Sequence, residues 1–189
     1  MVFPAQRKIR KPEAKLTPLE KQVAEALLKL EDDREIAVDL KVLYITAVKE
    51  FPVPDDKKAA VVFVPLEMLD AFQKDSETII RKLEKGFQDH RFIIVGDRKI
   101  QKELYTIRDG ESVRRPRAAT KGGVHNGFLA DLCHPIHVIG KRTIYSVGGD
   151  VKVQVSLPQQ KASDVSDRVK TYATVYKELT DNTTEFIFM

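Results

Sequence analysis

The sequence predicts an α+β fold in which antiparallel hairpins carry flanking helices and a long basic loop separates two halves. Two apolar runs joined by a short polar turn predict a hairpin over residues 42–64. A Gly-Gly-Asp turn between β-branched segments predicts a second one over 143–157. Amphipathic stretches flank both hairpins and predict helices. Neighbouring hairpins favour α+β over a doubly wound parallel sheet.

The first predicted half, residues 17–97, begins with a strong helix start. Thr17 can cap the helix, Pro18 suits its first position, and Glu20 completes a capping box. The apolar stripe that follows predicts a helix to about Glu31, before Asp32-Asp33. The remaining predicted elements are strands at 42–51 and 59–64, a long helix from Pro65 to Phe87, and a strand at 92–95.

The second predicted half, residues 124–189, repeats the order helix, hairpin, helix, strand, although the sequence contains no detectable internal repeat. Its predicted elements are a short helix at 124–133, strands at 143–147 and 151–157, a helix at 163–179, and an edge strand at 185–188. The sequence leaves open whether the two halves share one core.

Composition narrows the class of protein. With 189 residues and 42% hydrophobic content, the chain is long enough for one sizeable core or two small ones. No apolar run approaches the roughly 18 residues that span a bilayer, so we expect no membrane partner. A single cysteine, Cys133, excludes an internal disulfide framework and fits a reducing compartment. The default expectation is a soluble cytosolic or nuclear protein.

Basic residues are segregated along the chain, although the net charge is only +4. Residues 1–15 hold five bases against one acid, and residues 91–121 hold nine against four, so the rest is net acidic. We interpret residues 1–16 as an extended basic arm and 98–123 as a structureless basic loop. Such segregation indicates a polyanionic partner reached by these two segments.

The basic segments supply the candidate RNA-binding residues. An arginine fork donates two parallel hydrogen bonds to phosphate, and lysine adds a point charge. Because only Tyr105 is aromatic between Arg98 and Lys121, we expect contacts with the RNA backbone rather than with unstacked bases. The candidates from charge alone are Arg98, Lys99, Arg114, Arg115, Arg117 and Lys121 in the loop, and Arg7, Lys8, Arg10 and Lys11 in the arm.

Catalytic signatures are missing from the sequence, which has no phosphate-binding loop, dinucleotide fingerprint or nucleophile elbow. We therefore expect no enzyme, no cofactor and no small-molecule substrate. One alternative is a metal-assisted enzyme that uses Cys133 and His137, with His134 and His125 nearby. Another is an interaction adaptor for an acidic protein partner. The pairs Asp32-Asp33 and Asp55-Asp56 fit solvated turns better than acid–base chemistry.

Several stretches resemble the eukaryotic-type small-subunit ribosomal protein seven family, in the family's order and over most of the chain. They are DLKVLYITAVKE (39–50), KKAAVVFVPLEMLDAFQK (57–74), IIRKLEKGF (79–87), RRPRAAT (114–120), VHNGFLADLCHPIHVIGKR (124–142) and VKTYATVYKELT (169–180). The resemblance implies a structural component of the small subunit of the cytoplasmic ribosome, with nucleolar passage during assembly. It also implies small-subunit rRNA and neighbouring ribosomal proteins as partners, and no activity of its own.

Carried over position by position, the resemblance implies rRNA contacts at Arg98 and Lys99 and at the three arginines of RRPRAAT. It adds Lys141 and Arg142 of VIGKR. The stretch between Ile100 and Val113 carries three acids where relatives are more basic, so the contacts are weighted toward residues 114–121.

Overall fold

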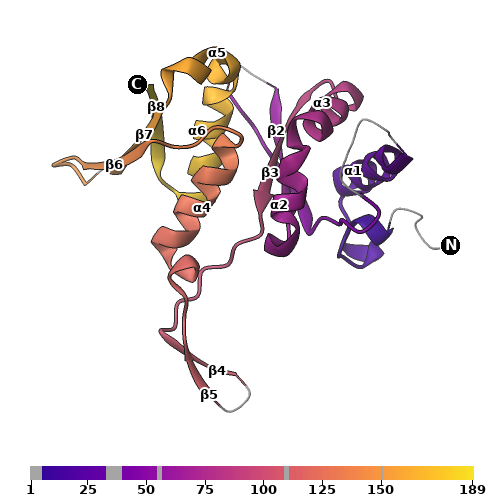
Figure 1. Ribbon diagram of the computed structural model, residues 1–189, viewed down its shortest axis with the longest axis horizontal. Helices are drawn as coiled ribbons and strands as arrows, with labels where there is room; N and C mark the ends of the chain where they lie inside the picture. The colour runs from indigo at the N-terminus through magenta and orange to yellow at the C-terminus, as the bar shows by residue number, and fades with distance from the viewer. Residues whose placement is uncertain (1–5, 33–39, 55–56, 109–110, 150) are drawn as a thin grey trace.

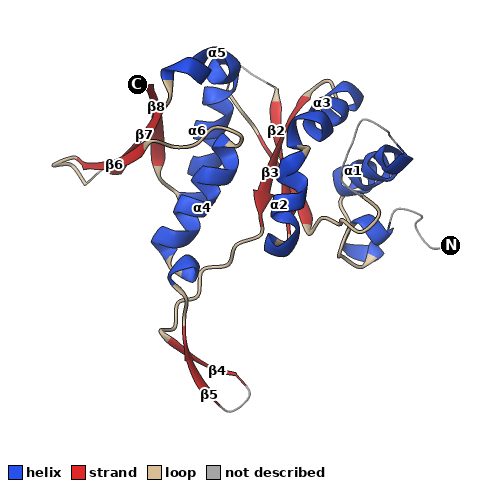
Figure 2. Cartoon of the chain, in the orientation of Figure 1, coloured by secondary structure: helices blue, strands red, loops and turns tan. Residues whose placement is uncertain are grey.

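The computed structural model describes residues 6–32, 40–54, 57–108, 111–149 and 151–189. The first half forms a three-stranded sheet with helices packed on it (Figure 2). Strand β1 pairs antiparallel with β2, as predicted, whereas β3 pairs parallel with β2 after a helical crossover. The elements are α1 (Pro18–Lys29), β1 (Ala47–Phe51), β2 (Lys58–Val64), α2 (Leu66–Lys74), α3 (Ser76–Gly86) and β3 (His90–Gly96).

The second half has the same topology. Strand β6 pairs antiparallel with β7, and β8 pairs parallel with β7 at the edge of the sheet. The elements are α4 (Lys121–Cys133), β6 (Gly140–Tyr145), β7 (Val151–Leu157), α5 (Ala162–Val165), α6 (Val169–Thr180) and β8 (Thr183–Phe188). The expected α+β class is confirmed, and the repeated element order of the sequence corresponds to a repeated three-dimensional arrangement.

The elements stack in four layers (Figure 1). Helices α1, α2 and α3 cover one face of the first sheet, and α4 and α6 lie between the first sheet and the second. Strands β2 and β3 send alternate side chains into two apolar clusters, one on each face. The cluster around α4 and α6 contains residues of both sheets, so the two halves share a core.

This layering explains the two kinds of strand sequence. Strand β2 has a helix layer on both faces, so six consecutive residues from Ala59 to Val64 are buried and the sequence is continuously apolar. Strand β7 is covered on one face, so Val153, Val155 and Leu157 are buried while their neighbours are half-buried or exposed. The pattern of each strand therefore reports how many of its faces are covered.

Several predicted elements differ from the structure. The helix predicted over 163–179 is divided into α5, a 3₁₀ turn (Ser166–Arg168) and α6, and the strand predicted over 143–147 lies at Gly140–Tyr145. The strand predicted from Val42 begins only at Ala47, and Val42 itself is exposed. The long helix predicted from Pro65 to Phe87 is divided at Asp75, whose backbone leaves the helical region at φ −114° and ψ 22°. Asp and Ser favour helix ends over helix interiors, which explains a break at Asp75-Ser76. The predicted turn residues Asp33, Asp55, Asp56 and Asp150 lie outside the described residues.

The N-terminal segment is folded where it is described. Residues 6–16 were expected to be extended, but they form the 3₁₀ turns Gln6–Lys8 and Glu13–Lys15 and lie against α1. Ile9 is buried and forms an isolated parallel bridge with Ile45. Burial of this aliphatic side chain helps to attach the segment to the body. Residues 1–5 of the predicted arm lie outside the described residues.

Candidate nucleic-acid interface

A β-hairpin projects from the body between the two halves, where the sequence predicted a structureless loop. Strands β4 (Tyr105–Arg108) and β5 (Glu111–Arg114) pair antiparallel, with Arg108 opposite Glu111 (Figure 1). The signal for this hairpin was present in the sequence, because Asp109-Gly110 between β-prone residues is a strong two-residue turn signature. We call residues 99–116 the hairpin arm, and residues 114–121 its neck.

The three arginines of the neck have different environments. Arg114 is exposed and lies opposite Tyr105 in the strand register, and Arg117 is exposed in the 3₁₀ turn Arg117–Ala119. Arg115 is half-buried instead, and its Nη1 donates to the carbonyl oxygens of Gln101 (2.7 Å) and Lys102 (3.0 Å). Arg115 therefore ties the two sides of the arm together, while Arg114 and Arg117 face solvent.

The N-terminus of α4 adjoins the neck. Thr120 caps the helix by accepting from the backbone N–H of Gly123 at 3.2 Å, and its hydroxyl donates to the carbonyl of Arg117 at 2.6 Å. A Cβ on Gly123 would lie 2.4 Å from that same carbonyl, so glycine is required for the close approach. Arg117 and the exposed Lys121 are thereby held at the positive end of the helix dipole.

A hollow of about 300 Å³ lies beside the neck, and Lys99, a further basic residue, is part of its lining. Its lining combines Lys99 and Arg114 with polar and apolar groups of the arm. Lys99, Arg114, Arg117 and Lys121 are all exposed, and residues 114–121 contain no acid. These four residues form a cationic surface suited to phosphate, and we call it the neck surface.

Arg98 lies apart from the neck surface. Its guanidinium forms a two-point ion pair with the buried carboxylate of Asp131 on α4, with Nη2 3.1 Å from Oδ1. The second oxygen of Asp131 also accepts from the backbone N–H of Gly96 at 2.9 Å. This geometry makes Arg98 a bridge between β3 and α4.

Lys141 and Arg142 lie on opposite faces of β6, because adjacent side chains of a strand alternate. The Nζ of Lys141 donates to Asn126 Oδ1 on α4 at 2.9 Å, and burial lowers the pKa of Lys141. The pKa of His125, one residue before Asn126, is lowered by burial and by Lys121 and Lys141. Lys141 thus faces α4, whereas Arg142 belongs to the open face of the second sheet.

The N-terminal candidates are largely engaged within the chain. Lys8 is buried, donates to the carbonyls of Leu40 and Leu43, and pairs with Glu31, which also pairs with Arg7. Further along the segment, Lys11 pairs with Glu20 at 2.5 Å, and Arg10 bonds the hydroxyl of Tyr44 at 2.9 Å. The sequence located these cations, but their partners are carboxylates, carbonyls and a tyrosine hydroxyl of this chain.

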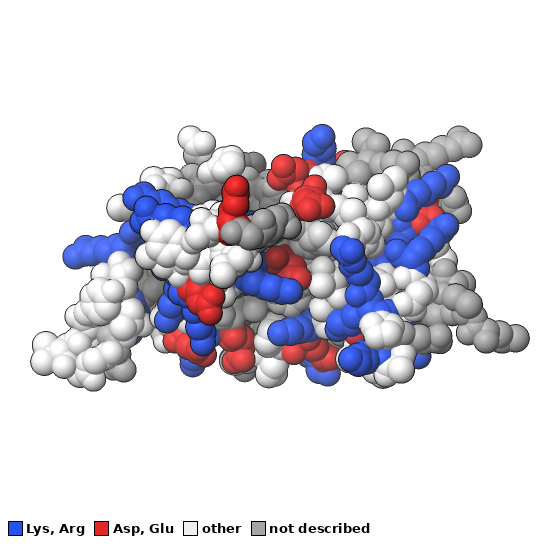
Figure 3. All heavy atoms as spheres, turned by 90° about the horizontal axis from the view of Figure 1, so that it is seen from below, with Lys and Arg blue, Asp and Glu red and all other residues white. Residues whose placement is uncertain are grey.

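The surface around the arm carries charges of both signs. Figure 3 views the molecule from below and shows basic side chains interspersed with acidic ones. The neck surface is therefore a local concentration of positive charge rather than part of a uniformly basic face.

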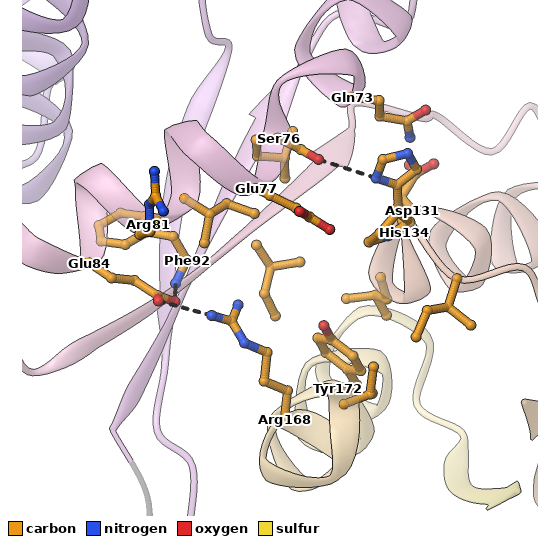
Figure 4. A pocket seen from close by; sticks show the side chains of 17 residues that line it. Gln73, Ser76, Glu77, Arg81, Glu84, Phe92, Asp131, His134, Arg168 and Tyr172 are labelled. Carbon is orange, nitrogen blue, oxygen red and sulfur yellow. Dashed lines mark hydrogen bonds and ion pairs between the residues drawn. The ribbon is translucent and has the colours of Figure 1, made fainter. Parts of the chain in front are cut away.

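A second hollow, of about 330 Å³, lies between α3 and the second half (Figure 4). Glu84 accepts from Arg168 at 2.9 Å and from the backbone N–H of Phe92 at 3.3 Å. Ser76 lies 3.3 Å from His134 Nδ1, again across the two halves. The contacts with Arg168 and His134 join α3 to the segments around α4 and α6, so these polar groups of the hollow serve the junction between the halves.

The residues of the metal-assisted alternative do not form a metal-binding cluster among the described residues. His134 is engaged with Ser76, His125 lies 3.3 Å from the side chain of Asn182, and His137 is exposed. Within the described ranges, no group of three or more His, Cys, Asp or Glu residues could hold a metal ion. In the same ranges, no helix is long and apolar enough to cross a membrane.

Cys133 should be chemically inert in the native protein. The thiol is buried, and its burial raises the pKa to about 12, so almost no thiolate exists near neutral pH. We expect iodoacetamide to leave Cys133 unmodified in the folded protein and to alkylate it fully in denaturant, as measured by intact mass. Equal alkylation rates in both conditions would contradict the buried placement.

Comparison with known proteins places the chain in a family. The model of the family described as Ribosomal protein S7e matches residues 7–188. The chain is 33% identical over 189 residues to small ribosomal subunit protein eS7 of Avicennia marina. The aligned region covers 99% of this chain and 98% of that protein. It is 35% identical over 176 residues to eS7A of Saccharomyces cerevisiae, with 89% and 92% covered. The resemblance noted in the sequence is confirmed, and the chain belongs to the ribosomal protein S7e family.

Proposed function

We propose that this protein is a structural constituent of the small subunit of the cytoplasmic ribosome and binds rRNA phosphates through the neck surface. The observation that most directly supports this proposal is a cluster of exposed bases beside the capped start of α4: Lys99, Arg114, Arg117 and Lys121. Neutralising phosphates releases condensed counterions and gives affinity without reading bases. Family membership supports this role, which involves no reaction, no cofactor and no small-molecule substrate.

Lys141 and Arg142 extend the proposed interface onto β6, with Lys141 on the side that faces α4. We assign Arg98, Arg115 and Lys8 to the fold instead, because they are buried or half-buried and their cationic groups are engaged with groups of this chain, whereas Lys141 is exposed. Neighbouring ribosomal proteins are the other partners in this proposal. The protein would work in cytoplasmic ribosomes and pass through the nucleolus during assembly.

The double variant Arg114→Ala, Arg117→Ala tests the proposal. We expect its affinity for small-subunit rRNA fragments to fall roughly tenfold, and the slope of log K against log salt to fall by about 2. Electrophoretic mobility shifts at several salt concentrations measure both quantities. The matched control is Lys170→Ala, Lys177→Ala, which removes two exposed lysines from α6.

Unchanged affinity and salt slope in the neck variant would contradict the proposed interface. Sedimentation distinguishes the ribosomal role from the adaptor alternative. A ribosomal constituent sediments with small subunits, whereas an adaptor for an acidic protein stays in the soluble fraction. Recovery of the wild-type chain only in the soluble fraction would contradict the ribosomal role itself.

A further inference from the structure

The hollow beside the neck, which we call the neck hollow, combines positive charge with apolar surface. Its volume is about 300 Å³, which is at the small end of ligand pockets. No acid is among the described residues that line it. The lining bases are Lys99, Arg114 and Arg115, and the apolar residues are Ile100, Val113, Pro116 and Ala119. Such a lining favours a small ligand that has both an anionic and an apolar part.

One face of the hairpin arm forms part of this lining. Thr106 and Val113 are paired across the two strands, so their side chains lie on the same face. The backbone N–H of Arg115 donates to the carbonyl of Leu104 at 2.9 Å, so the pairing continues beyond β5. Alternation then returns Arg115 to the face of Val113. Thr106, Val113 and Arg115 therefore share one face, and all three line the neck hollow.

The guanidinium of Arg115 is held in place by the backbone. Its Nη1 donates to the carbonyls of Gln101 (2.7 Å) and Lys102 (3.0 Å). Its Nε is buried and has no hydrogen-bond partner in the described part of the chain, so these contacts do not use all of its donors. Guanidinium planes stack on nucleobases as aromatic rings do. Arg115 thus keeps its structural role and supplies a stacking group where aromatic residues are scarce.

The apolar residues indicate which kind of anion fits. Ile100 is 44% exposed and Val113 is 41% exposed, although both line the neck hollow. A phosphate group alone would leave these side chains in water. A nucleotide satisfies both parts of the lining, because its phosphate is anionic and the faces of its base pack on apolar and planar groups. An unpaired nucleotide fits best, since its base is available without the cost of unpairing and unstacking a helix.

We propose that the neck hollow receives the base of one unpaired rRNA nucleotide, with the adjoining phosphate against Lys99 and Arg114. The inference rests on the proposed function, in which the neck surface binds rRNA phosphates, and it adds a recognition element to that surface. RNA with a bulged or looped nucleotide is then preferred over a continuous duplex. Contact with phosphates alone is the competing outcome.

Two synthetic RNAs test the preference: a fully paired duplex, and the same duplex with a single bulged 2-aminopurine. We expect the wild-type chain to bind the bulged RNA at least about fivefold more tightly, measured by anisotropy of an end label. The 2-aminopurine emission should also change on binding, because the base leaves water. Equal affinities or an unchanged emission overturns the inference and leaves the proposed function standing. Absence of salt-dependent binding to both RNAs contradicts the proposed function, and the inference with it.

Ala119→Leu tests where the base binds, because the larger side chain fills part of the neck hollow without changing any charge. The matched control is Ala118→Leu, since Ala118 is exposed and is not among the lining residues. We expect Ala119→Leu to bind both RNAs equally to within about twofold, with duplex affinity within about twofold of wild type. A retained preference in this variant overturns the inference, and so does an equal loss in the control.

Val113→Thr is a second variant that keeps a β-branched shape in β5 but places a hydroxyl in the lining. It should lower the preference for the bulged RNA by at least about twofold, and an unchanged preference overturns the inference. In assembled small subunits, 2′-hydroxyl acylation of the rRNA then locates the nucleotide. One unpaired nucleotide should be more reactive in subunits that carry Ala119→Leu than in those that carry Ala118→Leu. Identical reactivity profiles overturn the inference.

Discussion

Arg98→Ala is expected to lower the free energy of unfolding by about 3 kcal/mol, because it leaves the buried carboxylate of Asp131 without its cationic partner. The side chain of Asp131 is only 3% exposed and that of Arg98 is 18% exposed, so solvent screens the pair weakly. The bridge also joins β3 of the first half to α4 of the second. Its loss should therefore loosen the junction from which the hairpin arm projects.

Glycines on either side of Arg98 provide a second way to disturb the bridge. A Cβ on Gly127 would lie 2.4 Å from Nε of Arg98, and one on Gly96 would lie 2.8 Å from Nη1. A Cβ at either position would therefore force the Arg98 side chain to shift from its place beside Asp131. Gly127→Ala should be destabilising in the same assay although alanine is the better helix former.

Urea denaturation followed by circular dichroism measures these changes, with Arg114→Ala as the matched control. Arg114 is exposed and forms no ion pair among the described residues, so its replacement should change stability by less than about 0.5 kcal/mol. Equal stability of the Arg98 and Arg114 variants would show that the bridge contributes nothing, and would return Arg98 to the candidate rRNA contacts.

Local features of the fold were predictable from the sequence where neighbouring residues determine them. The capping box of Thr17 and Glu20 is formed, and the apolar run 59–64 is a buried strand as expected. The parallel pairing of β3 with β2, and of β8 with β7, was not predicted. It depends on how helical crossovers return the chain to a sheet. Alternation of residues identifies a strand but not the direction of its partner.

For the candidate site, the sequence could predict only which segments are rich in basic residues. The sequence correctly identified where bases concentrate, but the partners of several of them are distant in the chain. Asp131 lies 33 residues from Arg98, and Glu31 lies 24 residues from Arg7. A spacing pattern carries no sign of such pairs. In the folded chain, some of these basic residues therefore form internal ion pairs and hydrogen bonds, whereas others are the exposed bases of the neck surface.

Glu20→Ala is expected to cost about 3 kcal/mol of stability, because one buried carboxylate serves three parts of the fold. Its Oε2 accepts from the N–H of Thr17 at 3.0 Å in the capping box. Its Oε1 accepts from the N–H of Val48 on β1 at 3.1 Å and from Lys11 at 2.5 Å. Alanine would leave the Val48 N–H buried without a partner and would remove the Lys11 contact between the N-terminal segment and α1.

The charge of Glu20 makes part of this contribution dependent on pH. Burial acts to raise the pKa of Glu20, but hydrogen bonds from Lys11, Thr17 and Val48 outweigh it and hold the pKa below its ordinary value of 4.5. A carboxyl whose pKa is depressed in the folded state stabilises the protein above its ordinary pKa. That contribution is lost as the pH falls through the lower, folded-state value.

Glu20→Gln isolates the charge, because the amide keeps an acceptor oxygen but cannot ionise. Urea unfolding of both proteins at several pH values should show the wild-type chain more stable at neutral pH. The difference should narrow progressively below about pH 4.5, as protonated Glu20 comes to resemble glutamine. A difference that stayed constant over this range would mean that hydrogen bonding alone, and not the ionised carboxylate, holds the N-terminal segment against α1 and β1.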